Sequence, residues 1–358
     1  MFLAMNLKNY FYYLAKFANF QRYYLGYKLF PEQLSKPTID RSTYIEWIDS
    51  KILPLGKIHL SVSSICNAKC IFCPYENVSK KETFIKSTMN MEVFKQIYQQ
   101  LLHLSNINQV TFSSTLGEPL IDSTIFEKIS MLKKIPHIGR IYMYSNGILL
   151  GKGEVAQKLA LSGLNEYNIS IASFDKENWS LLYKSKEFDS LIKGISLLLD
   201  ALNHNNSSLK VRFNFRPNLS PMKIFFQPQL QRIIKKVKNR KSIKFSYLYS
   251  FLDWSGQIDF EKLPQGFKMQ PKYKEQSWLC KKLYDIVILH DGSVRLCGCN
   301  VKESEHDDLV IGNILHENLA EIIHSPKAQQ IRKEFLDGIF RPICQQCSFY
   351  EPYMGPKG

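Results

Sequence analysis

Residues 57–73 read KIHLSVSSICNAKCIFC, a strand-like segment that runs directly into three cysteines. From Lys57 to Ser63 polar and apolar residues alternate and then give way to the thiols of Cys66, Cys70 and Cys73. Three and then two residues separate these cysteines. The pattern predicts a β-strand whose carboxyl end carries a cluster of thiols.

Strand-like and helix-like segments alternate along the chain beyond this cluster. Further strands are predicted over 108–114, 139–144, 167–172, 209–215 and 242–249, and helices over 91–104, 124–134, 154–162, 188–202 and 228–237. Six strand–helix units with short connections predict a parallel sheet with helices outside, either an open sheet or a partial barrel. The chemistry of such α/β folds lies at the carboxyl ends of the strands.

The alternation stops after about Phe251. Residues 286–289 and 294–297, with Asp291-Gly292 between them, predict a β-hairpin, and residues 319–335 predict a helix. We therefore expect a helical N-terminal extension over 1–56, a barrel-like domain over 57–252 and a small α+β domain over 253–358.

The composition is that of a folded, basic protein. Of 358 residues, 45% are apolar and 22% are charged, which excludes wholesale disorder. The 47 Lys and Arg residues exceed the 32 Asp and Glu residues by 15, which favours an anionic substrate, a nucleic acid or an acidic partner. Because the sequence shows no signal peptide and no apolar run that would span a membrane, we expect a cytoplasmic protein with reduced thiols.

Two segments suggest surfaces with a partner. Phe17, Phe20, Tyr24 and Tyr27 share one helical face, which predicts packing against the main domain or, because basic residues flank them, attachment to a membrane interface. The stretch 201–252 holds eleven Lys and Arg residues and no acidic one. It predicts a solvated basic face or a docking site for an acidic substrate, a peptide or an electron donor such as flavodoxin. We expect no nucleic acid, because no recognisable module for it is present.

Seven of the eight cysteines fall in tight groups: Cys66, Cys70 and Cys73; Cys297 and Cys299; and Cys344 and Cys347, with Cys280 apart. Such clusters in a reducing compartment indicate metal or iron–sulfur ligands. Three neighbouring thiols without a local fourth ligand would leave one iron of a [4Fe-4S] cluster open to a substrate or cofactor. The alternative is zinc held by three cysteines and a histidine, either His59 or a distant one.

The first cysteine cluster, Cys-x3-Cys-x-aromatic-Cys after the first strand, resembles that of the radical S-adenosylmethionine (radical SAM) superfamily. Leu116-Gly117-Glu118-Pro119 is similar to the family's Gly-Gly-Glu-Pro turn, which binds the methionine amino group, with Leu at the first position. Ser145-Asn146-Gly147 and Ser173-Phe174-Asp175 resemble the family's segments after the third and fourth strands, the serine of the latter lying near the SAM ribose.

This resemblance covers roughly residues 57–250 and implies a partial (β/α)6 barrel of TIM type. It implies a [4Fe-4S] cluster on Cys66, Cys70 and Cys73, with SAM chelating the open iron. The implied SAM-binding residues are Phe72, Gly117, Glu118, Asn146, Ser173 and Arg216, with Arg216 paired to the SAM carboxylate and Phe72 shielding the cluster near the adenine.

The second set, Cys280, Cys297, Cys344 and Cys347, resembles the ligands of the SPASM domain in its shortened form, called twitch. That resemblance implies one auxiliary [4Fe-4S] cluster, whereas the spacing alone would also permit a four-cysteine zinc ribbon. Cys299 is left over, either in place of Cys297 as a ligand or as a free thiol.

We therefore expect an enzyme that reductively cleaves SAM to a 5′-deoxyadenosyl radical and abstracts hydrogen from a C–H bond of a small-molecule or peptide substrate. A net oxidation using the auxiliary cluster, with electrons from a flavodoxin- or ferredoxin-type donor, is the main expectation. One alternative is a redox-neutral radical epimerase with Cys299 as the hydrogen donor. The other is a non-enzymatic zinc-binding adaptor for nucleic acid.

Overall fold

The computed structural model describes residues 7–29, 42, 45–46, 48, 57–104, 107–113, 115–270, 279–298, 307–345 and 347–350, with the backbone alone for 26–29. Among these residues, no helix is long and apolar enough to cross a bilayer.

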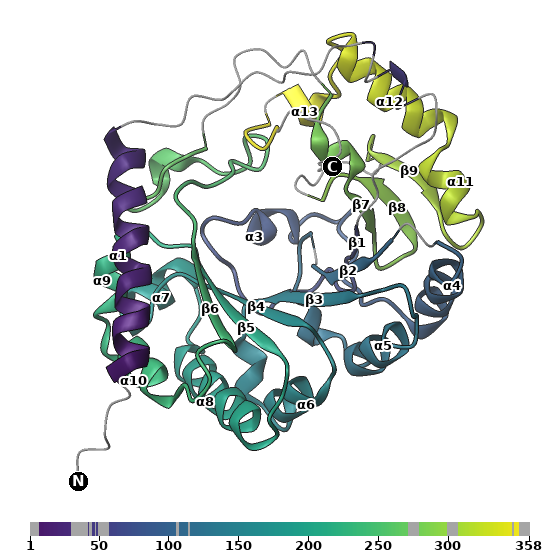
Figure 1. Ribbon diagram of the computed structural model, residues 1–358. Helices are drawn as coiled ribbons and strands as arrows, with labels where there is room; N and C mark the ends of the chain where they lie inside the picture. The colour runs from purple at the N-terminus through teal and green to yellow at the C-terminus, as the bar shows by residue number, and fades with distance from the viewer. Residues whose placement is uncertain are drawn as a thin grey trace.

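One curved sheet organises the molecule (Figure 1). Within the described residues it has nine strands in the order β6-β5-β4-β3-β2-β1-β7-β8-β9. These are β1 (Lys57–Leu60), β2 (Gln109–Phe112), β3 (Arg140–Ser145), β4 (Glu166–Ile171), β5 (Lys210–Phe215), β6 (Ile243–Tyr247), β7 (Ile286–Ile288), β8 (Ser293–Leu296) and β9 (Val310–Asn313). Strands β1 to β6 pair in parallel in sequence order, and β6 and β9 end the described sheet. The predicted α/β partial barrel is thereby confirmed.

Helices follow the strands and cover the convex side of the sheet in Figure 1. They are α4 (Met91–Leu101), α5 (Ile125–Leu132), α6 (Val155–Leu161), α7 (Lys176–Tyr183), α8 (Phe188–His204), α9 (Pro221–Phe225) and α10 (Pro228–Lys236), whereas the short α3 (Tyr75–Val78) lies inside the curve of the sheet. Helix α8 shows the reason, because Leu191, Ile195, Leu198 and Leu202 recur every three or four residues and are all buried. Helices α3, α7 and α9 were not predicted.

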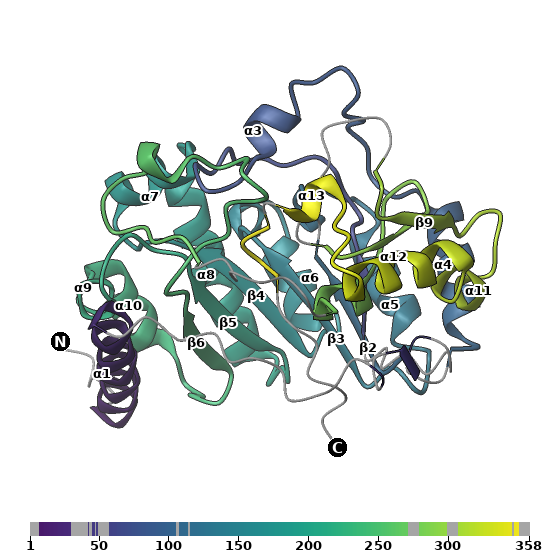
Figure 2. The ribbon, with the colours of Figure 1, turned by 90° about the horizontal axis from the view of Figure 1, so that it is seen from above.

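Helix α1 (Leu7–Leu29) packs on the outer side of β5 and β6. The ring of Phe17 lies 5.7 Å from that of Phe215 and 5.3 Å from that of Phe245. Tyr24 continues the contact, with its ring 6.0 Å from that of Tyr247. Figures 1 and 2 both place α1 beside α9 and α10 at the β6 end of the sheet. The aromatic stripe therefore packs against the barrel, while the side chain of Tyr27 lies outside the described residues.

The C-terminal part continues the barrel's own sheet, because β7 pairs in parallel with β1. Helices α11 (Leu319–Ile323), α12 (Pro326–Leu336) and α13 (Pro342–Gln345) complete it. The single helix predicted over 319–335 is wrong. Ser325 caps α12 by accepting a hydrogen bond from the Ala328 N–H, and Pro326, which has no N–H, cannot extend α11.

Candidate active site

The loop between β1 and α3 brings Cys66, Cys70 and Cys73 together. The Cys73 N–H donates to the Cys70 carbonyl at 3.0 Å, and the Cys66 N–H donates to the phenol oxygen of Tyr75 at 2.9 Å. Burial raises the pKa of the Cys70 thiol well above its usual value, and the neighbouring thiols of Cys73 and Cys66 raise it further. Thiolates in this loop would therefore be costly unless a cation accompanies them.

This donor set fits an iron–sulfur cluster better than a lone ion. Sulfur is the ligand that such clusters take, and burial also raises the pKa of the Cys66 thiol, to about 12. No group of three or more His, Cys, Asp or Glu side chains among the described residues is placed to hold one metal ion. The case for iron here accordingly comes from the chemistry and burial of the three thiols.

The turn after β2 is fixed by a position that only glycine fits. Gly117 has φ +149°, and a Cβ there would lie 2.1 Å from the Ser63 carbonyl oxygen, at the base of the cysteine loop. Its neighbour Leu116, which departs from the family's glycine, has no left-handed backbone and packs with Tyr75 and Val78. Apolar packing beside the cysteines therefore accommodates a leucine at this position.

Glu118 follows this turn and is buried, with 2% of its surface exposed. Its carboxylate accepts hydrogen bonds from the Ser145 hydroxyl at 2.7 Å, the Asn146 N–H at 2.7 Å and the Leu120 N–H at 3.1 Å. All three donors are neutral, and burial raises the pKa of Glu118 to about 7 in spite of them. A bound ammonium group would supply the positive charge that these donors lack.

Asn146 connects Glu118 to the cysteine loop. Its side-chain N–H group donates to the Asn67 side-chain oxygen at 2.7 Å and lies 3.8 Å from the Cys66 sulfur. Gly147, which follows, takes φ +76° and lets the chain turn away from the end of β3. The turn after β2, the turn after β3 and the cysteine loop thus form one hydrogen-bonded unit.

Two of the other residues expected near SAM, Phe72 and Ser173, are both buried but have different surroundings. Phe72 is buried in an aromatic group, with its ring 5.7 Å from that of Tyr183 and 5.6 Å from that of Phe251. Ser173 is fully buried, and its hydroxyl oxygen accepts hydrogen bonds from the Gln227 side chain at 2.8 Å and the Asp175 N–H at 3.0 Å. Gln227 was missed, since no local pattern marks a glutamine 54 positions away as the partner of this serine.

Arg216 follows β5 and lies close to the cysteine loop. Its N–H donates to the Ile171 carbonyl at 2.9 Å, which continues the pairing of β4 and β5. Burial raises the pKa of both Cys70 and Cys73, and the charge of Arg216 opposes this rise at each thiol. A cation beside the cysteines would attract an anionic group that approaches them.

The concave face of the sheet is polar. In β5, Phe213 and Phe215 contact aromatic rings on the helix side, so Arg212, Asn214 and Arg216 point to the opposite side, into the barrel. Asn214 donates to the Asn168 side chain of β4 at 3.2 Å. TIM-barrel interiors are normally filled by Val, Ile and Leu, so a polar lumen indicates a site and not a packed core.

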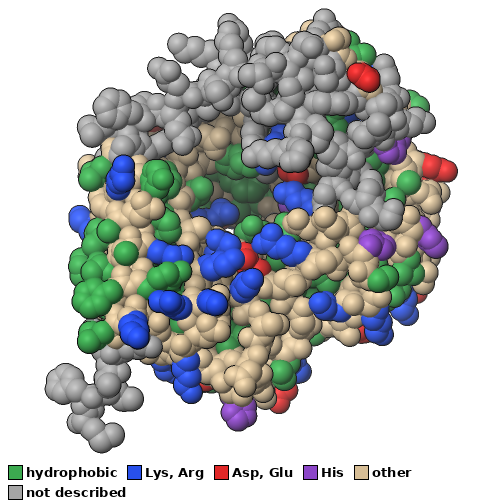
Figure 3. Space-filling view, in the orientation of Figure 1, with side chains coloured by type: hydrophobic (Ala, Val, Ile, Leu, Met, Phe, Trp, Pro, Cys, Tyr) green, Lys and Arg blue, Asp and Glu red, His purple; other side chains and the backbone are tan. Residues whose placement is uncertain are grey.

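Four charged side chains meet in this lumen. The guanidinium of Arg212 donates to Glu166 at 2.9 and 3.2 Å, and Arg140 and Lys244 each lie 3.5 Å from the same carboxylate. Burial would raise the pKa of Glu166, but the hydrogen bond and charge of Arg212, then Arg140 and Lys244, hold it below its usual value. Figure 3 shows a hollow on this face in which Lys and Arg side chains surround an acidic one.

His59 and Thr111 lie side by side on β1 and β2 and continue this row. Within the described residues, the Nε2 atom of His59 and the hydroxyl of Thr111 are buried without a hydrogen-bond partner. Burial lowers the pKa of His59 to about 4, so its ring is neutral at pH 7. The predicted zinc alternative took His59 or a distant histidine as the fourth ligand, but the charged groups that act on His59 are Lys57, Asp285 and Lys282, and no thiol is among them.

A second cavity collects the remaining described cysteines. Cys280, Cys297, Cys344 and Cys347 all line it, together with apolar residues such as Leu283. Burial raises the pKa of the Cys344 thiol far above its usual value, and Cys297, Cys347 and Cys280 raise it further. The set therefore has the composition and proximity of a four-thiol iron–sulfur site, while Cys299 lies outside the described residues.

Arg295 supports this cavity and was not predicted. Cys297 adopts φ +66°, an unusual left-handed conformation for a residue with a side chain, and its carbonyl accepts a hydrogen bond from the Arg295 guanidinium. The Cys297 N–H donates to the Asp285 carbonyl at 2.9 Å. These two bonds hold the cysteine in its strained conformation.

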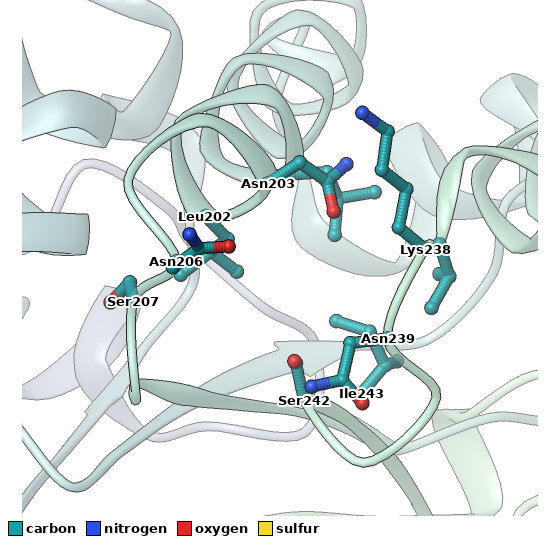
Figure 4. A pocket seen from close by; sticks show the side chains of 10 residues that line it. Leu202, Asn203, Asn206, Ser207, Lys238, Asn239, Ser242 and Ile243 are labelled. Carbon is teal, nitrogen blue, oxygen red and sulfur yellow. The ribbon is translucent and has the colours of Figure 1, made fainter.

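A third cavity contains no cysteine. Figure 4 shows it between the end of α8 and the loop before β6, lined by Asn203, Asn206, Lys238 and Asn239 among others. It lies apart from both thiol sites and is not part of the candidate active site.

Two family models match the chain. Residues 60–209 match the radical SAM superfamily, and residues 280–348 match SPASM, an iron–sulfur cluster-binding domain. A GTP 3′,8-cyclase from Petrotoga mobilis is 32% identical over 154 residues, which are 43% of this chain and 46% of that protein. A probable GTP 3′,8-cyclase from Methanocella arvoryzae is 22% identical over 328 residues, which are 85% of this chain and 99% of that protein. The chain spans 46% and 42% of the first two cyclases that it matches.

Solved structures show the same fold at low identity. The Streptococcus suis protein SuiB bound to the precursor peptide SuiA has a TM-score of 0.54 and 16% identity over 91% of this chain and 80% of that one. BtrN in complex with AdoMet and 2-DOIA has a TM-score of 0.51 and 17% identity over 82% and 92%. Taken with the cysteine loop and the two family models, these likenesses lead to one assignment: the chain belongs to the radical SAM superfamily, with its [4Fe-4S] cluster and SAM, and carries a C-terminal SPASM iron–sulfur domain.

Proposed function

We propose that this radical SAM enzyme abstracts a hydrogen atom from a C–H bond of a small anionic substrate held in the barrel lumen, and that the net reaction is a two-electron oxidation. The observation that carries the proposal is the polar lumen, because its charged row on β3 to β6 leads along β5 to Arg216 beside the cysteine loop. From Arg212 to Arg216 the strand rises about 13 Å, which is the length of a small metabolite.

The residues of the loop and its neighbouring turns would hold the cofactors. Cys66, Cys70 and Cys73 would ligate three irons. The Glu118 carboxylate, whose protein hydrogen-bond donors are all neutral, would accept a hydrogen bond from the SAM ammonium group. Gly117 and Asn146 keep this carboxylate in place, Arg216 would pair with the SAM carboxylate, Ser173 would lie towards the ribose, and Phe72 would exclude water from the cluster. When bound, the cluster and SAM supply a 5′-deoxyadenosyl radical.

The lumen supports an anionic substrate. Arg140, Arg212 and Lys244 share the single carboxylate of Glu166, so this group of four retains two positive charges. A carboxylate or phosphate of the substrate would compensate them in a partly desolvated site, where charge pairing is strong. The partnerless polar atoms of His59 and Thr111 would bind the substrate's hydroxyl or amide groups.

The second thiol site would provide the electron acceptor that the proposed oxidation requires. Removal of one hydrogen atom leaves a carbon radical, and loss of one electron and one proton from that radical completes a two-electron oxidation. The electron would pass to the iron–sulfur cluster that Cys280, Cys297, Cys344 and Cys347 would ligate in the SPASM domain, and a flavodoxin- or ferredoxin-type protein would exchange electrons with the enzyme.

A redox-neutral cyclisation is the second candidate. It is favoured by the relatives named GTP 3′,8-cyclase and by a basic lumen that would suit a nucleoside triphosphate. Epimerisation with Cys299 as hydrogen donor is a third, and this residue lies outside the described part of the chain.

One experiment separates these candidates. The reconstituted enzyme is incubated without oxygen with SAM, dithionite and a set of phosphorylated and carboxylated metabolites that includes GTP, and 5′-deoxyadenosine and products are measured by mass spectrometry in deuterated water. Oxidation predicts a product two hydrogens lighter without solvent deuterium at the reacting carbon. A GTP isomer would support cyclisation instead, and an isomer carrying solvent deuterium would support epimerisation.

A further inference from the structure

The segment that follows α3 is fixed beside the cysteine loop. The hydroxyl of Ser64, two residues before Cys66, donates to the Ile85 carbonyl at 2.6 Å and accepts a hydrogen bond from the Ser87 N–H at 2.8 Å. The Ser64 N–H donates to the Ser87 carbonyl at 2.9 Å. Figure 2 shows α3 and this segment at one edge of the molecule. These hydrogen bonds hold a piece of the surface against the base of the loop that carries the thiols.

A series of contacts leads from this segment to Cys66. The ring of Phe84 lies 6.2 Å from the ring of Tyr75, edge to face, and the Tyr75 hydroxyl accepts a hydrogen bond from the Cys66 N–H at 2.9 Å. Tyr75 is buried, whereas Ile85, directly after Phe84, is 70% exposed. Single exposed apolar residues are common on protein surfaces. The position of this one is unusual, because two aromatic rings connect its neighbourhood to a thiol-bearing residue.

Lysines surround the same part of the surface and share one carboxylate. The Lys184 ammonium group donates to Glu76 of α3 at 2.6 Å, and the Lys80 nitrogen lies 3.8 Å from that carboxylate. The hydrogen bond and charge of Lys184, then the charges of Lys80 and Lys69, lower the pKa of Glu76. Three cations near one carboxylate leave two positive charges uncompensated. Lys86, on the segment itself, is also exposed.

The charge balance of this surface is therefore positive around an apolar centre. We call it the α3 face and define it by its apolar, basic and acidic residues: Ile85; Lys69, Lys80, Lys81, Lys86 and Lys184; and Glu76 and Glu82. Transient protein interfaces combine an apolar centre with a polar rim, and charge complementarity speeds their formation. The α3 face has the composition of a docking site for an acidic protein.

Its position favours a partner that delivers electrons. Electron transfer slows steeply with distance, so a carrier that serves the cysteine loop has to dock close to it. The other basic segment of the chain, the loop 237–242, directly precedes β6 and lies at the amino ends of the parallel strands. The cysteine loop follows the carboxyl end of β1, at the opposite end of the barrel. The α3 face is thus the better placed of the two basic surfaces.

We propose that the α3 face is the docking surface for an acidic flavodoxin. The proposal rests on the proposed function only in its need for an external electron donor. Carboxylates around the flavin pair with the lysines, and the apolar dimethylbenzene edge of the flavin packs on Ile85. The flavin loses one electron, and the iron–sulfur site on Cys66, Cys70 and Cys73 gains it. A nucleic acid or an anionic membrane would attract the same lysines but would deliver no electron.

The first test measures docking without turnover. An acidic bacterial flavodoxin is added to the reconstituted full-length enzyme, and the dissociation constant is measured by biolayer interferometry, with affinity expected to fall as salt increases. The pair Lys80→Gln and Lys86→Gln should weaken binding at least tenfold, because two charges leave the rim. Ile85→Ser should weaken it about tenfold, because an apolar side chain leaves the centre. Carbodiimide cross-linking should join flavodoxin carboxylates to Lys80, Lys86 or Lys184 of the parent enzyme.

The second test measures electron delivery. SAM cleavage to 5′-deoxyadenosine is followed without substrate, first with reduced flavodoxin and then with dithionite, so the result does not depend on the proposed oxidation. At flavodoxin concentrations below saturation, the α3-face variants should lose about tenfold in rate with flavodoxin, in line with their weaker docking. They should keep the parent rate with dithionite, a small reductant that needs no docking surface.

Matched controls lie on other elements. The pair Lys238→Gln and Lys241→Gln removes two exposed charges from the loop 237–242, and Leu161→Ser on α6 removes a side chain that is 61% exposed. Neither control should change flavodoxin binding or the rate with flavodoxin. The proposal is overturned if the parent does not bind flavodoxin, if either α3-face variant binds it like the parent, or if the loop 237–242 pair loses binding instead. It is equally overturned if the α3-face variants also lose the rate with dithionite, or if a ferredoxin binds the α3 face and flavodoxin does not.

Discussion

The carboxylate of Glu118 accepts a hydrogen bond of 2.7 Å from the backbone N–H of Asn146, 28 positions along the chain. This bond joins the turn after β2 to the turn after β3, and Asn146 in turn reaches Asn67 and the Cys66 sulfur. A change at Glu118 therefore acts on a pocket at the edge of the cysteine loop without removing a thiol.

Replacing Glu118 by Gln should weaken SAM binding by about tenfold or more while the iron content stays unchanged, because an amide keeps the shape of the side chain but not its negative charge. Binding of SAM to the parent should also weaken as the pH falls below about 7, because burial raises the pKa of Glu118 to about 7 and the protonated carboxyl no longer attracts an ammonium group. Equilibrium dialysis with labelled SAM, between pH 6 and 8, measures both effects.

The control for this change is Glu154→Gln, since the side chain of Glu154 is 73% exposed at the start of α6. This variant should bind SAM like the parent at every pH. A Glu118→Gln variant with the same affinity and the same pH profile as the parent would remove Glu118 from the SAM site.

The two thiol sites should each account for half of the iron. Protein reconstituted without oxygen should hold about eight irons, as expected for two four-iron clusters. Changing Cys66, Cys70 and Cys73 together to Ala should leave about four irons by the same count and abolish 5′-deoxyadenosine formation. Iron and zinc are measured by plasma mass spectrometry, and one equivalent of zinc with little iron would contradict the assignment of both sites.

The SPASM site should be needed for product and not for SAM cleavage. Changing Cys344 and Cys347 to Ala removes two of the four thiols that line the second cavity. The variant should still form 5′-deoxyadenosine with dithionite, because the loop at Cys66 is untouched, but it should not convert substrate. Because a metal site also stabilises the small domain around it, circular dichroism must first show that the variant is folded. Product at the parent rate would make this site purely structural.

Much of this site is readable from the sequence because its parts are local. The strand before Cys66, the Gly117-Glu118 turn and the Asn146-Gly147 turn each lie within a few residues of a strand end, and parallel strands bring such ends together. Contacts between distant segments left no such signal. The Gln227–Ser173 bond depends on how the start of α10 packs against the end of β4, which no short pattern encodes.

The break between α11 and α12 shows that a local pattern can also give a wrong prediction. The apolar spacing over 319–335 continues across Ser325 and Pro326, so periodicity predicted one helix where a capping serine and a proline begin a second. The polar lumen was also missed, because alternation along a strand separates its two faces but does not show which face lines the interior of the barrel.

Arg295 should raise the reduction potential of the cluster at the second thiol site. Its side chain is buried, with 1% of the residue's surface exposed, and one guanidinium nitrogen has no hydrogen-bond partner among the described residues. The guanidinium pairs with Asp307 at 2.5 Å and bonds the carbonyl of Cys297, which has left-handed backbone geometry. Replacing Arg295 by Met keeps much of the side-chain volume but removes the charge and these bonds.

The Arg295→Met variant should have a more negative reduction potential at the SPASM cluster, because a buried positive charge near an iron–sulfur cluster favours its reduced form. An EPR-monitored redox titration of protein lacking Cys66, Cys70 and Cys73 isolates this cluster, and its potential is read without any turnover. Arg295→Lys keeps the charge but not the forked hydrogen bonds. Its reduction potential should therefore lie closer to that of the parent than to that of Arg295→Met, while Cys297 is held less firmly. Arg341→Met, which removes an arginine that pairs with Glu334 instead, serves as the matched control and should leave the potential unchanged. Equal potentials in the parent and the Arg295→Met variant would show that Arg295 only packs the domain.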